Sequence, residues 1–254
     1  MKCHISVDKA FDSIFKQPHW AKKLIIGGVL SLLATLFVNV YALLYLPQIL
    51  VNVAVAILLF SLGIVGVIIH FGLTCLLMGY NIKFVNNALN NVQEVLPCWV
   101  NFKGLFVNGV KWLGISIIYY IMVIAISVVL TAICMIPYSS SHIWSFLLLI
   151  PTAFIVVAGA VLPLIETMFA RNLEISDAFN LKHAYNVITK NFGQYMILLL
   201  TTFGIYLLAL IPYTLSTITI VGVILVPFLA FIVKLLVRNL FAQFYKKALE
   251  KEGI

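Results

Sequence analysis

Two ionisable residues stand out because each lies within a long apolar stretch of the chain. His70 is near the middle of Ile49–Met78, and Glu166 follows Pro163 near the end of another such stretch. Stretches of this length and composition are typical of membrane-spanning helices, where ionisable groups are costly and often functional. An imidazole can relay protons near neutral pH. Because Pro163 leaves a backbone carbonyl without its helical donor, that oxygen and Glu166 together would suit an ion or a solute.

Each of these residues also has an ordinary structural interpretation, which we favour. His70 would be a neutral imidazole bonded to a neighbouring helix, because a proton relay needs partners and the sequence has no Asp or Glu at similar depth. Glu166 would cap its helix or pair with Arg171, which follows closely in the sequence. The sequence leaves both interpretations of each residue open.

A third candidate is a short segment that should form a defined turn between two apolar stretches. Pro97 restricts Leu96 to an extended conformation, and the aromatic rings of Trp99 and Phe102 would fix the turn in place. Together with Asn101, these residues form a candidate docking turn for a partner protein.

Motifs for enzymatic chemistry are missing from the chain. We find no HExxH, Walker or GxSxG motif, and no His/Asp/Glu cluster suited to metal binding or acid–base work. The four cysteines have no CxxC spacing, so neither a zinc site nor a disulfide framework follows from them. The sequence therefore predicts a non-enzymatic protein without catalytic, cofactor-binding or metal-binding residues.

Six apolar stretches must position these candidates. Hydrophobic residues make up 63% of the 254 residues and charged residues 9%, whereas a soluble domain has roughly 45–50% and about 25%. This composition excludes a water-soluble fold. About 20 apolar residues suffice to span a bilayer, and the predicted spans are Leu24–Leu46, Ile49–Met78, Leu113–Ile136, Ile143–Phe169, Tyr195–Ile211 and Ile218–Val237.

The basic residues are arranged asymmetrically around these spans. All 16 Lys and Arg residues fall on one side of the alternating pattern of spans: 15 lie before, after or between the spans, and Lys234 lies near the end of the sixth span. Because basic residues near spanning helices stay on the cytoplasmic side, we expect a multi-pass protein of the cytoplasmic membrane with both termini inside. The formal net charge of +8 then reflects orientation and contact with anionic lipid headgroups. It does not indicate a nucleic-acid partner.

Short connections on the other side predict three helical hairpins, and longer connections on the basic side are amphipathic. Apolar residues recur at helical spacing in Tyr80–Leu96, in Ile175–Phe192 and around Val7 and Phe11. Helices with one apolar face and Lys on the other tend to lie in the headgroup region, although packing against the other helices is the alternative. We also expect kinks at prolines within the fourth and sixth spans. The predicted fold class is therefore all-α, with six transmembrane helices in three hairpins and interfacial helices on the cytoplasmic side.

The chain is predicted to be a single membrane domain over residues 1–254. Similar openings, such as Ala10-Phe11 and Ala178-Phe179, indicate an internal repeat with units 1–95, 96–174 and 175–254. Repeats are common in transporters, but gene duplication also produces inert scaffolds, so the repeat does not by itself indicate transport.

Several segments resemble one family of membrane proteins. The most specific is Leu96-Pro97-Cys98-Trp99-Val100-Asn101-Phe102 with Gly109 downstream, which is similar to a Leu-Pro-x-Trp-x-Asp/Asn-Phe motif. Ala170-Arg171, Asp177-Ala178-Phe179 and Asn191-Phe192-Gly193 resemble its second half. The family is the prokaryotic integral membrane proteins catalogued as domain of unknown function 4013. The resemblance implies a six-helix membrane protein and no particular activity. Asn101 departs from the family pattern, in which Asp is common.

The sequence supports two hypotheses about function. The first is a non-enzymatic membrane protein that acts through contacts with membrane lipids or with other membrane proteins, for which the amphipathic segments and the Leu96–Phe102 turn offer surfaces. The second is a small-solute transporter or channel, in which a polar path joins His70 to Glu166.

Overall fold

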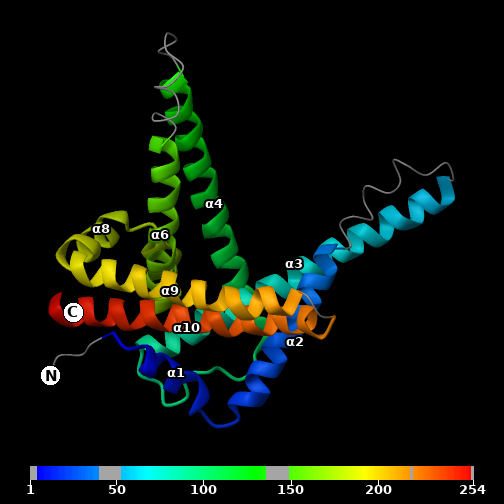
Figure 1. The fold of residues 1–254 in the computed structure, drawn as a ribbon, viewed down its shortest axis with the longest axis horizontal. Helices are drawn as coiled ribbons and strands as arrows, with labels where there is room; N and C mark the ends of the chain where they lie inside the picture. The colour runs from blue at the N-terminus through cyan, green and yellow to red at the C-terminus, as the bar shows by residue number, and fades with distance from the viewer. Residues whose placement is uncertain (1–4, 40–52, 136–148, 218–219, 253–254) are drawn as a thin grey trace.

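The computed structural model describes residues 5–39, 53–135, 149–217 and 220–252. These residues form helices and no strands (Figure 1). Six of the helices are long and apolar enough to cross a membrane, which confirms the all-α, polytopic prediction. The helices are α1 (Val7–Phe15), α2 (Trp20–Asn39), α3 (Val53–Leu89), α4 (Phe102–Met135), α6 (Leu149–Asn172), α7 (Ile175–Ala178), α8 (Leu181–Lys190), α9 (Phe192–Thr217) and α10 (Ile220–Glu252).

Three of the long helices extend well beyond the predicted spans. Helices α3, α4 and α10 contain 37, 34 and 33 residues. At a rise of about 1.5 Å per residue each is about 50–55 Å long, whereas a bilayer core is roughly 30 Å thick. A separate helix over Tyr80–Leu96 was therefore a wrong prediction, because Tyr80–Leu89 continues α3 without a break.

The other two amphipathic segments fold as helices of their own. The N-terminal stripe becomes α1, with Ser6 accepting a hydrogen bond from the backbone N–H of Lys9 at its start. The stripe over Ile175–Phe192 is divided into α7 and α8. Asn180 causes this division, because its side chain accepts from the backbone N–H of His183 and so caps the start of α8.

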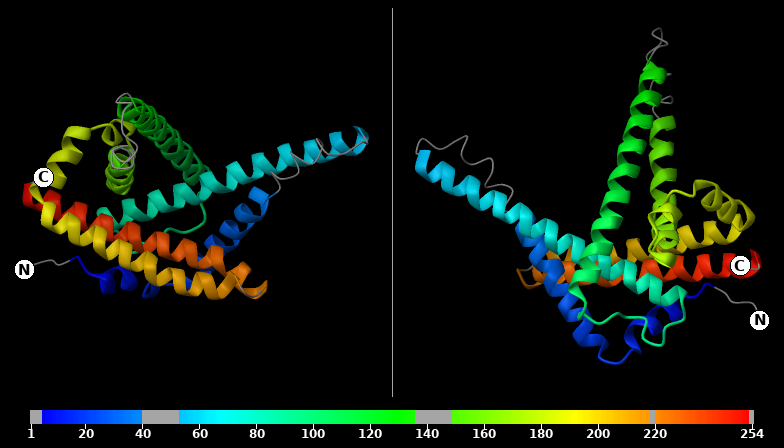
Figure 2. Two further views of the ribbon diagram at one scale, coloured as in Figure 1. Left: turned by 45° about the horizontal axis from the view of Figure 1, so that its top comes forward. Right: turned by 180° about the vertical axis from the view of Figure 1, so that it is seen from behind.

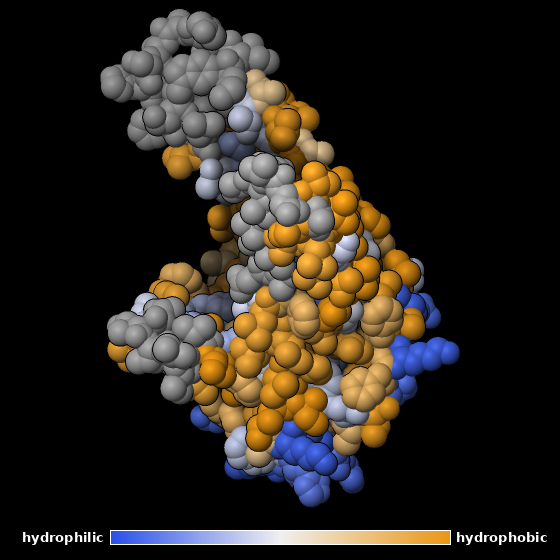
Figure 3. All heavy atoms as spheres, turned by 90° about the vertical axis from the view of Figure 1, so that its right-hand side faces the viewer, coloured by the Kyte–Doolittle hydropathy of each residue, from blue (hydrophilic) through white to orange (hydrophobic). Residues whose placement is uncertain are grey.

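Charge and burial divide the described residues into two halves. The charged half comprises residues 5–30, 75–119, 161–199 and 231–252, and it contains every described Lys, Arg, Asp and Glu. The apolar half comprises residues 31–39, 53–74, 120–135, 149–160, 200–217 and 220–230. The hydrophobic core lies almost entirely in the charged half, where α3, α4, α6 and α10 meet. In Figure 3, apolar side chains cover most of the visible face and hydrophilic residues gather along one rim.

The long helices contact one another in the charged half and diverge beyond it. Contacts join α2 to α3, α4 to α6 and α9 to α10, and further contacts join these pairs to each other. The far part of α3 points away from the α4–α6 pair, and α9 and α10 run in a third direction (Figures 1 and 2). The predicted tight turns near Pro47 and Ser139 lie outside the described residues. Pro163, Pro212 and Pro227 lie inside α6, α9 and α10.

Candidate functional site

A buried ion pair joins α6 to α10 in the charged half. Nε of Arg238 donates to Oε1 of Glu166 at 2.5 Å, and the two side chains are 18% and 9% exposed. Arg171 is therefore not the partner of Glu166, contrary to the sequence-based expectation. Five residues correspond to about 140° of rotation on an α-helix, so Arg171 points to a different side of α6. The carbonyl of Pro163 accepts from the Thr167 hydroxyl at 2.8 Å, one turn along the same helix.

His70 links α3 to α2 in the apolar half. Its Nδ1 lies 2.8 Å from the backbone oxygen of Ala34, and its Nε2 lies 3.4 Å from the hydroxyl of Thr74. Because a carbonyl oxygen only accepts, Nδ1 carries the hydrogen in this contact. This arrangement corresponds to the structural interpretation of His70, an imidazole bonded to a neighbouring helix. His70 and Glu166 are thus held by two different pairs of helices.

The predicted turn is anchored by a buried lysine of α2. Nζ of Lys23 donates to Oε2 of Glu94 at 2.8 Å and to the backbone oxygen of Leu96 at 2.9 Å. In return, Nε1 of Trp99 donates to the backbone oxygen of Lys23 at 2.9 Å. The Lys23 side chain is only 7% exposed. A buried ammonium needs such partners, so this lysine and the turn hold each other in place.

Helix α3 holds the same turn from the other side. The Tyr80 and Trp99 rings stack with centroids 4.1 Å apart, and the Phe231 ring of α10 lies 5.7 Å from that of Tyr80. The side-chain amide of Asn87 donates to the backbone oxygens of Glu94 and Val95, both at 3.2 Å. The turn is thereby fastened to α2 and α3, and Tyr80 of α3 in turn contacts α10.

These contacts change which turn residues are available to a partner. Leu96, Pro97 and Trp99 are buried, so they stabilise the protein and offer no docking surface, in contrast to the sequence-based expectation. Asn101 is exposed and caps α4, because its Oδ1 accepts from the backbone N–H of Gly104 at 2.9 Å. Asp and Asn serve equally as N-caps, which explains how Asn101 fits a family pattern with Asp. Among the five residues of the predicted docking turn, Phe102 is apolar and exposed, at 50%.

Glu94 is the acidic member of this anchor. The hydrogen bond from Lys23 and its positive charge, with a smaller contribution from His19, hold the pKa of the Glu94 carboxyl below its usual range. Desolvation acts weakly in the opposite direction. The Glu94 side chain is 51% exposed, so water screens part of this attraction.

The backbones of α3 and α4 approach closely next to the turn. A Cβ atom built on Gly109 would lie 1.8 Å from the backbone oxygen of Cys75, and one built on Gly79 would lie 1.7 Å from that of Leu105. Cys75 and Gly79 are four residues apart on α3, and Leu105 and Gly109 are four apart on α4. Small residues at this spacing let membrane helices pack backbone to backbone. Only glycine fits at positions 79 and 109.

Sequence reasoning missed several residues that join elements over long distances in the chain. The side-chain amide of Asn86 donates to the backbone oxygens of Ala170 at 2.8 Å and Arg171 at 3.0 Å, at the end of α6. The amide of Gln243 bonds both the backbone N–H and the oxygen of Ser6, which fixes α1 against α10. The available signal for such contacts was a polar residue on the apolar face of a helix. Their partners depend on how α6 and α10 fold back, which periodicity does not reveal.

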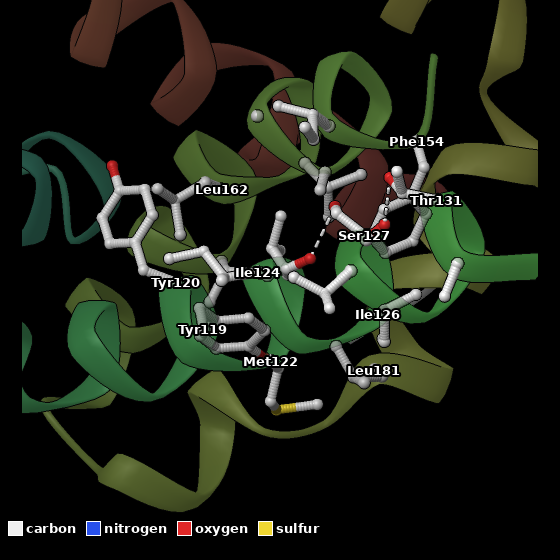
Figure 4. A pocket seen from close by; sticks show the side chains of 18 residues that line it. Tyr119, Tyr120, Met122, Ile124, Ile126, Ser127, Thr131, Phe154, Leu162 and Leu181 are labelled. Carbon is white, nitrogen blue, oxygen red and sulfur yellow. Dashed lines mark hydrogen bonds between the residues drawn. The ribbon is translucent and has the colours of Figure 1, made fainter. Parts of the chain in front are cut away.

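A groove with a volume of about 980 Å³ lies between α4 and α6. Its walls are apolar apart from a few hydroxyls (Figure 4). The Ser127 hydroxyl donates to the backbone oxygen of Val123 and that of Thr131 to the backbone oxygen of Ser127, both at 2.7 Å. Because these hydroxyls bond within their own helix, the groove presents little polarity for recognising a solute. Within the described part of the chain, no three His, Cys, Asp or Glu residues form a group that could hold a metal ion.

Residues 62–237 match the model of a family described as a protein of unknown function, DUF4013. The chain belongs to the DUF4013 family. The matched range includes the Leu96–Phe102 turn and the α3–α4 glycine crossing, whereas Lys23 and Arg238 of this DUF4013 protein lie outside it. No curated protein and no solved structure matches the chain.

Proposed function

We propose that this DUF4013 protein is a non-enzymatic protein of the cytoplasmic membrane that acts through contacts made by its charged half on the cytoplasmic side. The distribution of Lys and Arg supports this orientation, because the charged half contains all of the described basic residues. Both termini then lie in the cytoplasm.

The observation that carries the proposal is that polar side chains of the charged half bond to other parts of the same protein. Lys23, Asn86, Asn87, Arg238 and Gln243 each bond to another helix or connecting segment. They hold the helices together and do not converge on one reacting centre. A protein built in this way presents a rigid surface to a partner.

The surface that we assign to a partner protein is the exposed end of the turn and the first turns of α4. Val100 is 82% exposed, and its neighbours Phe102, Phe106, Val107 and Val110 are exposed large hydrophobic residues. Lys103 and Lys111 lie among them on α4. Apolar side chains between cations fit a helix of another membrane protein that presents apolar residues and carboxylates.

Lipid contact is the second part of the proposal and concerns α7 and α8. Ala184 and Val187 face the core, whereas Leu181 and Tyr185 are exposed. With Lys182 beside them, these exposed side chains suit the headgroup region of the cytoplasmic leaflet.

The test is crosslinking of the tagged full-length protein in its native membranes, followed by mild purification and mass spectrometry. We expect a stoichiometric partner that is lost from the V100Q/F102Q variant and retained by Tyr185→Gln, which alters an equally exposed site on α8. Both sites are outside the core, so the variants should fold. Unchanged recovery of the partner with V100Q/F102Q would overturn the proposal.

Transport of a small solute is the competing proposal, and prolines inside α6, α9 and α10 favour it. Proline-interrupted helices with ionisable residues recur at transport sites. Proton-dependent flux into liposomes that contain the purified protein, lost in His70→Ala, would support transport. Equal flux with and without the protein would reject it.

A further inference from the structure

Arg171 has no side-chain partner among the described residues, although it lies at the meeting point of three helices. Arg238 takes the carboxylate of Glu166, and no described residue forms an ion pair or hydrogen bond with the Arg171 guanidinium. The side chain is half-buried. A guanidinium is always charged and has five N–H donors. Because no side chain of the described residues uses them, these donors are free to bind an anion from outside the chain.

A cavity of about 210 Å³ lies against Arg171 at the end of the charged half. It is a half-open pocket at the ends of α3, α6 and α10, and the lining residues are Leu89, Asn90, Arg171, Lys246, Leu249 and Glu250. Because one water molecule occupies about 30 Å³ of liquid, this space admits a group of the size of a phosphate. Arg171 also lines a second pocket of about 180 Å³, together with Asp177, His183 and Tyr245.

The position of Arg171 is fixed by its neighbours. The amide of Asn86 holds the last carbonyls of α6, including that of Arg171 itself. Nζ of Lys246 donates to Oδ1 of Asn91, just after the end of α3. The Lys246 ammonium and the backbone at Arg171 are thus held at one cavity before any ligand arrives, which reduces the cost of binding.

We propose that Arg171 and Lys246 bind a phosphate group in this cavity. Arginine matches the paired oxygens of a phosphate with two parallel N–H donors, and lysine adds a point charge. Asn90, another lining residue, is uncharged and polar. Glu250 is the carboxylate in the lining, and its repulsion lowers the affinity for an anion. The phosphate belongs either to an anionic lipid headgroup or to a soluble phosphate compound. This inference does not rest on the proposed function.

The first experiment is calorimetric titration of the purified full-length protein in neutral detergent with inorganic phosphate at low salt. We expect Arg171→Gln to weaken binding about tenfold, because it removes charge-assisted hydrogen bonds. Glu250→Gln should tighten binding about threefold, because it removes a like charge. Lys103→Gln removes the same charge as Arg171→Gln at an exposed site on α4, and its affinity should stay within about twofold of the natural protein.

A second arm separates the two sources of phosphate. The protein is placed in nanodiscs of phosphatidylcholine with or without phosphatidylglycerol, and the lipids that stay bound are counted by native mass spectrometry. Retention of phosphatidylglycerol that Arg171→Gln abolishes identifies a headgroup. Phosphate binding in detergent without such retention identifies a soluble ligand.

Equal binding of phosphate and of phosphatidylglycerol by the natural protein and by Arg171→Gln would overturn the inference. If Arg171→Gln fails to elute as a folded species, Lys246→Gln decides the question in both experiments. We expect its binding to be about threefold weaker, and unchanged binding would again overturn the inference.

Discussion

The two ends of α4 show how differently the charged and apolar halves are built. Ile115, in the charged half, is 2% exposed, whereas Ile124, in the apolar half of the same helix, is 61% exposed. The largest fully buried side chains, which include Tyr80, Phe84 and Phe169, all belong to the charged half. In the apolar half the buried side chains are few and mostly small, such as Ala34, Ser127 and Ala209. One helix therefore belongs to the core at one end and exposes its apolar side chains outside the protein at the other.

The bilayer explains this contrast. Lipid tails are as apolar as leucine, so burying an apolar side chain against another helix removes no contact with water. Outside the hydrocarbon core water is present, and burial there gains the full hydrophobic free energy. The charged half therefore needs a core of its own, and the apolar half needs only a lipid-compatible surface.

The largest expected effect concerns the ion pair on which the charged half depends. Glu166→Ala should lower the free energy of unfolding by about 3–5 kcal/mol, because it leaves the largely buried Arg238 without its carboxylate. Denaturant titration in micelles measures this loss. The E166L/R238L variant removes both charges and should recover most of the stability. Equal stability of Glu166→Ala and the natural protein would show that the pair is not needed.

The comparison along α4 can be tested directly with one substitution at two sites. Ile115→Ala should cost about 2–5 kcal/mol, because it opens a cavity in the core. Ile124→Ala removes the same atoms from an exposed site and should change stability by less than about 0.5 kcal/mol. The same denaturant titration compares the two. A similar loss at both sites would mean that the apolar half is packed by protein.

The glycine crossing offers a second matched pair on the same helix. Gly109→Ala should cost about 1–3 kcal/mol, since the added Cβ meets the backbone oxygen of Cys75, which cannot move aside. No atom lies within 4 Å of a Cβ added at Gly114, so Gly114→Ala should be neutral or slightly stabilising. Thermal unfolding of both variants in detergent provides the measurement. A destabilised Gly114→Ala beside an unaffected Gly109→Ala would contradict this account.

The smallest effect concerns the pH dependence of the turn anchor. Folding lowers the pKa of Glu94. The stability that the Glu94 charge contributes is therefore fully present above the unfolded-state pKa of about 4.3. The contribution disappears as the pH falls through the lower folded-state pKa. The natural protein should therefore melt at a higher temperature than Glu94→Gln at neutral pH, and this difference should vanish in acid. A difference that persists in acid would show that the Glu94 charge is not its source.

The amphipathic segments show where sequence reasoning succeeded and where it failed. The N-terminal stripe was correctly predicted as a helix, because its apolar spacing and its capping Ser6 are local signals. For the Tyr80–Leu96 stripe the sequence left open whether it lies in the headgroup region or packs against the other helices, and its Tyr80–Leu89 part is the buried end of α3. A stripe of apolar residues looks the same whether it faces lipid or the side of α10.

The candidate site shows the same limit. The sequence identified Glu166 as a residue that needs a partner, but it named the nearest cation, Arg171. The pairing with Arg238 spans 72 positions in the chain, so only the packing of α6 against α10 brings it about. Lys23 and the turn are joined over a similar separation, and no sequence pattern distinguishes that lysine from its neighbours.

The sequence by itself determined the six apolar helices, the multi-pass membrane class and the family, because these follow from composition, local periodicity and short motifs. Tertiary structure alone decided which residues form the core, which turn residues are exposed, and which cation neutralises Glu166. Those outcomes depend on helices that meet across long sequence separations. A one-dimensional pattern records the apolar face of a helix but not what covers it.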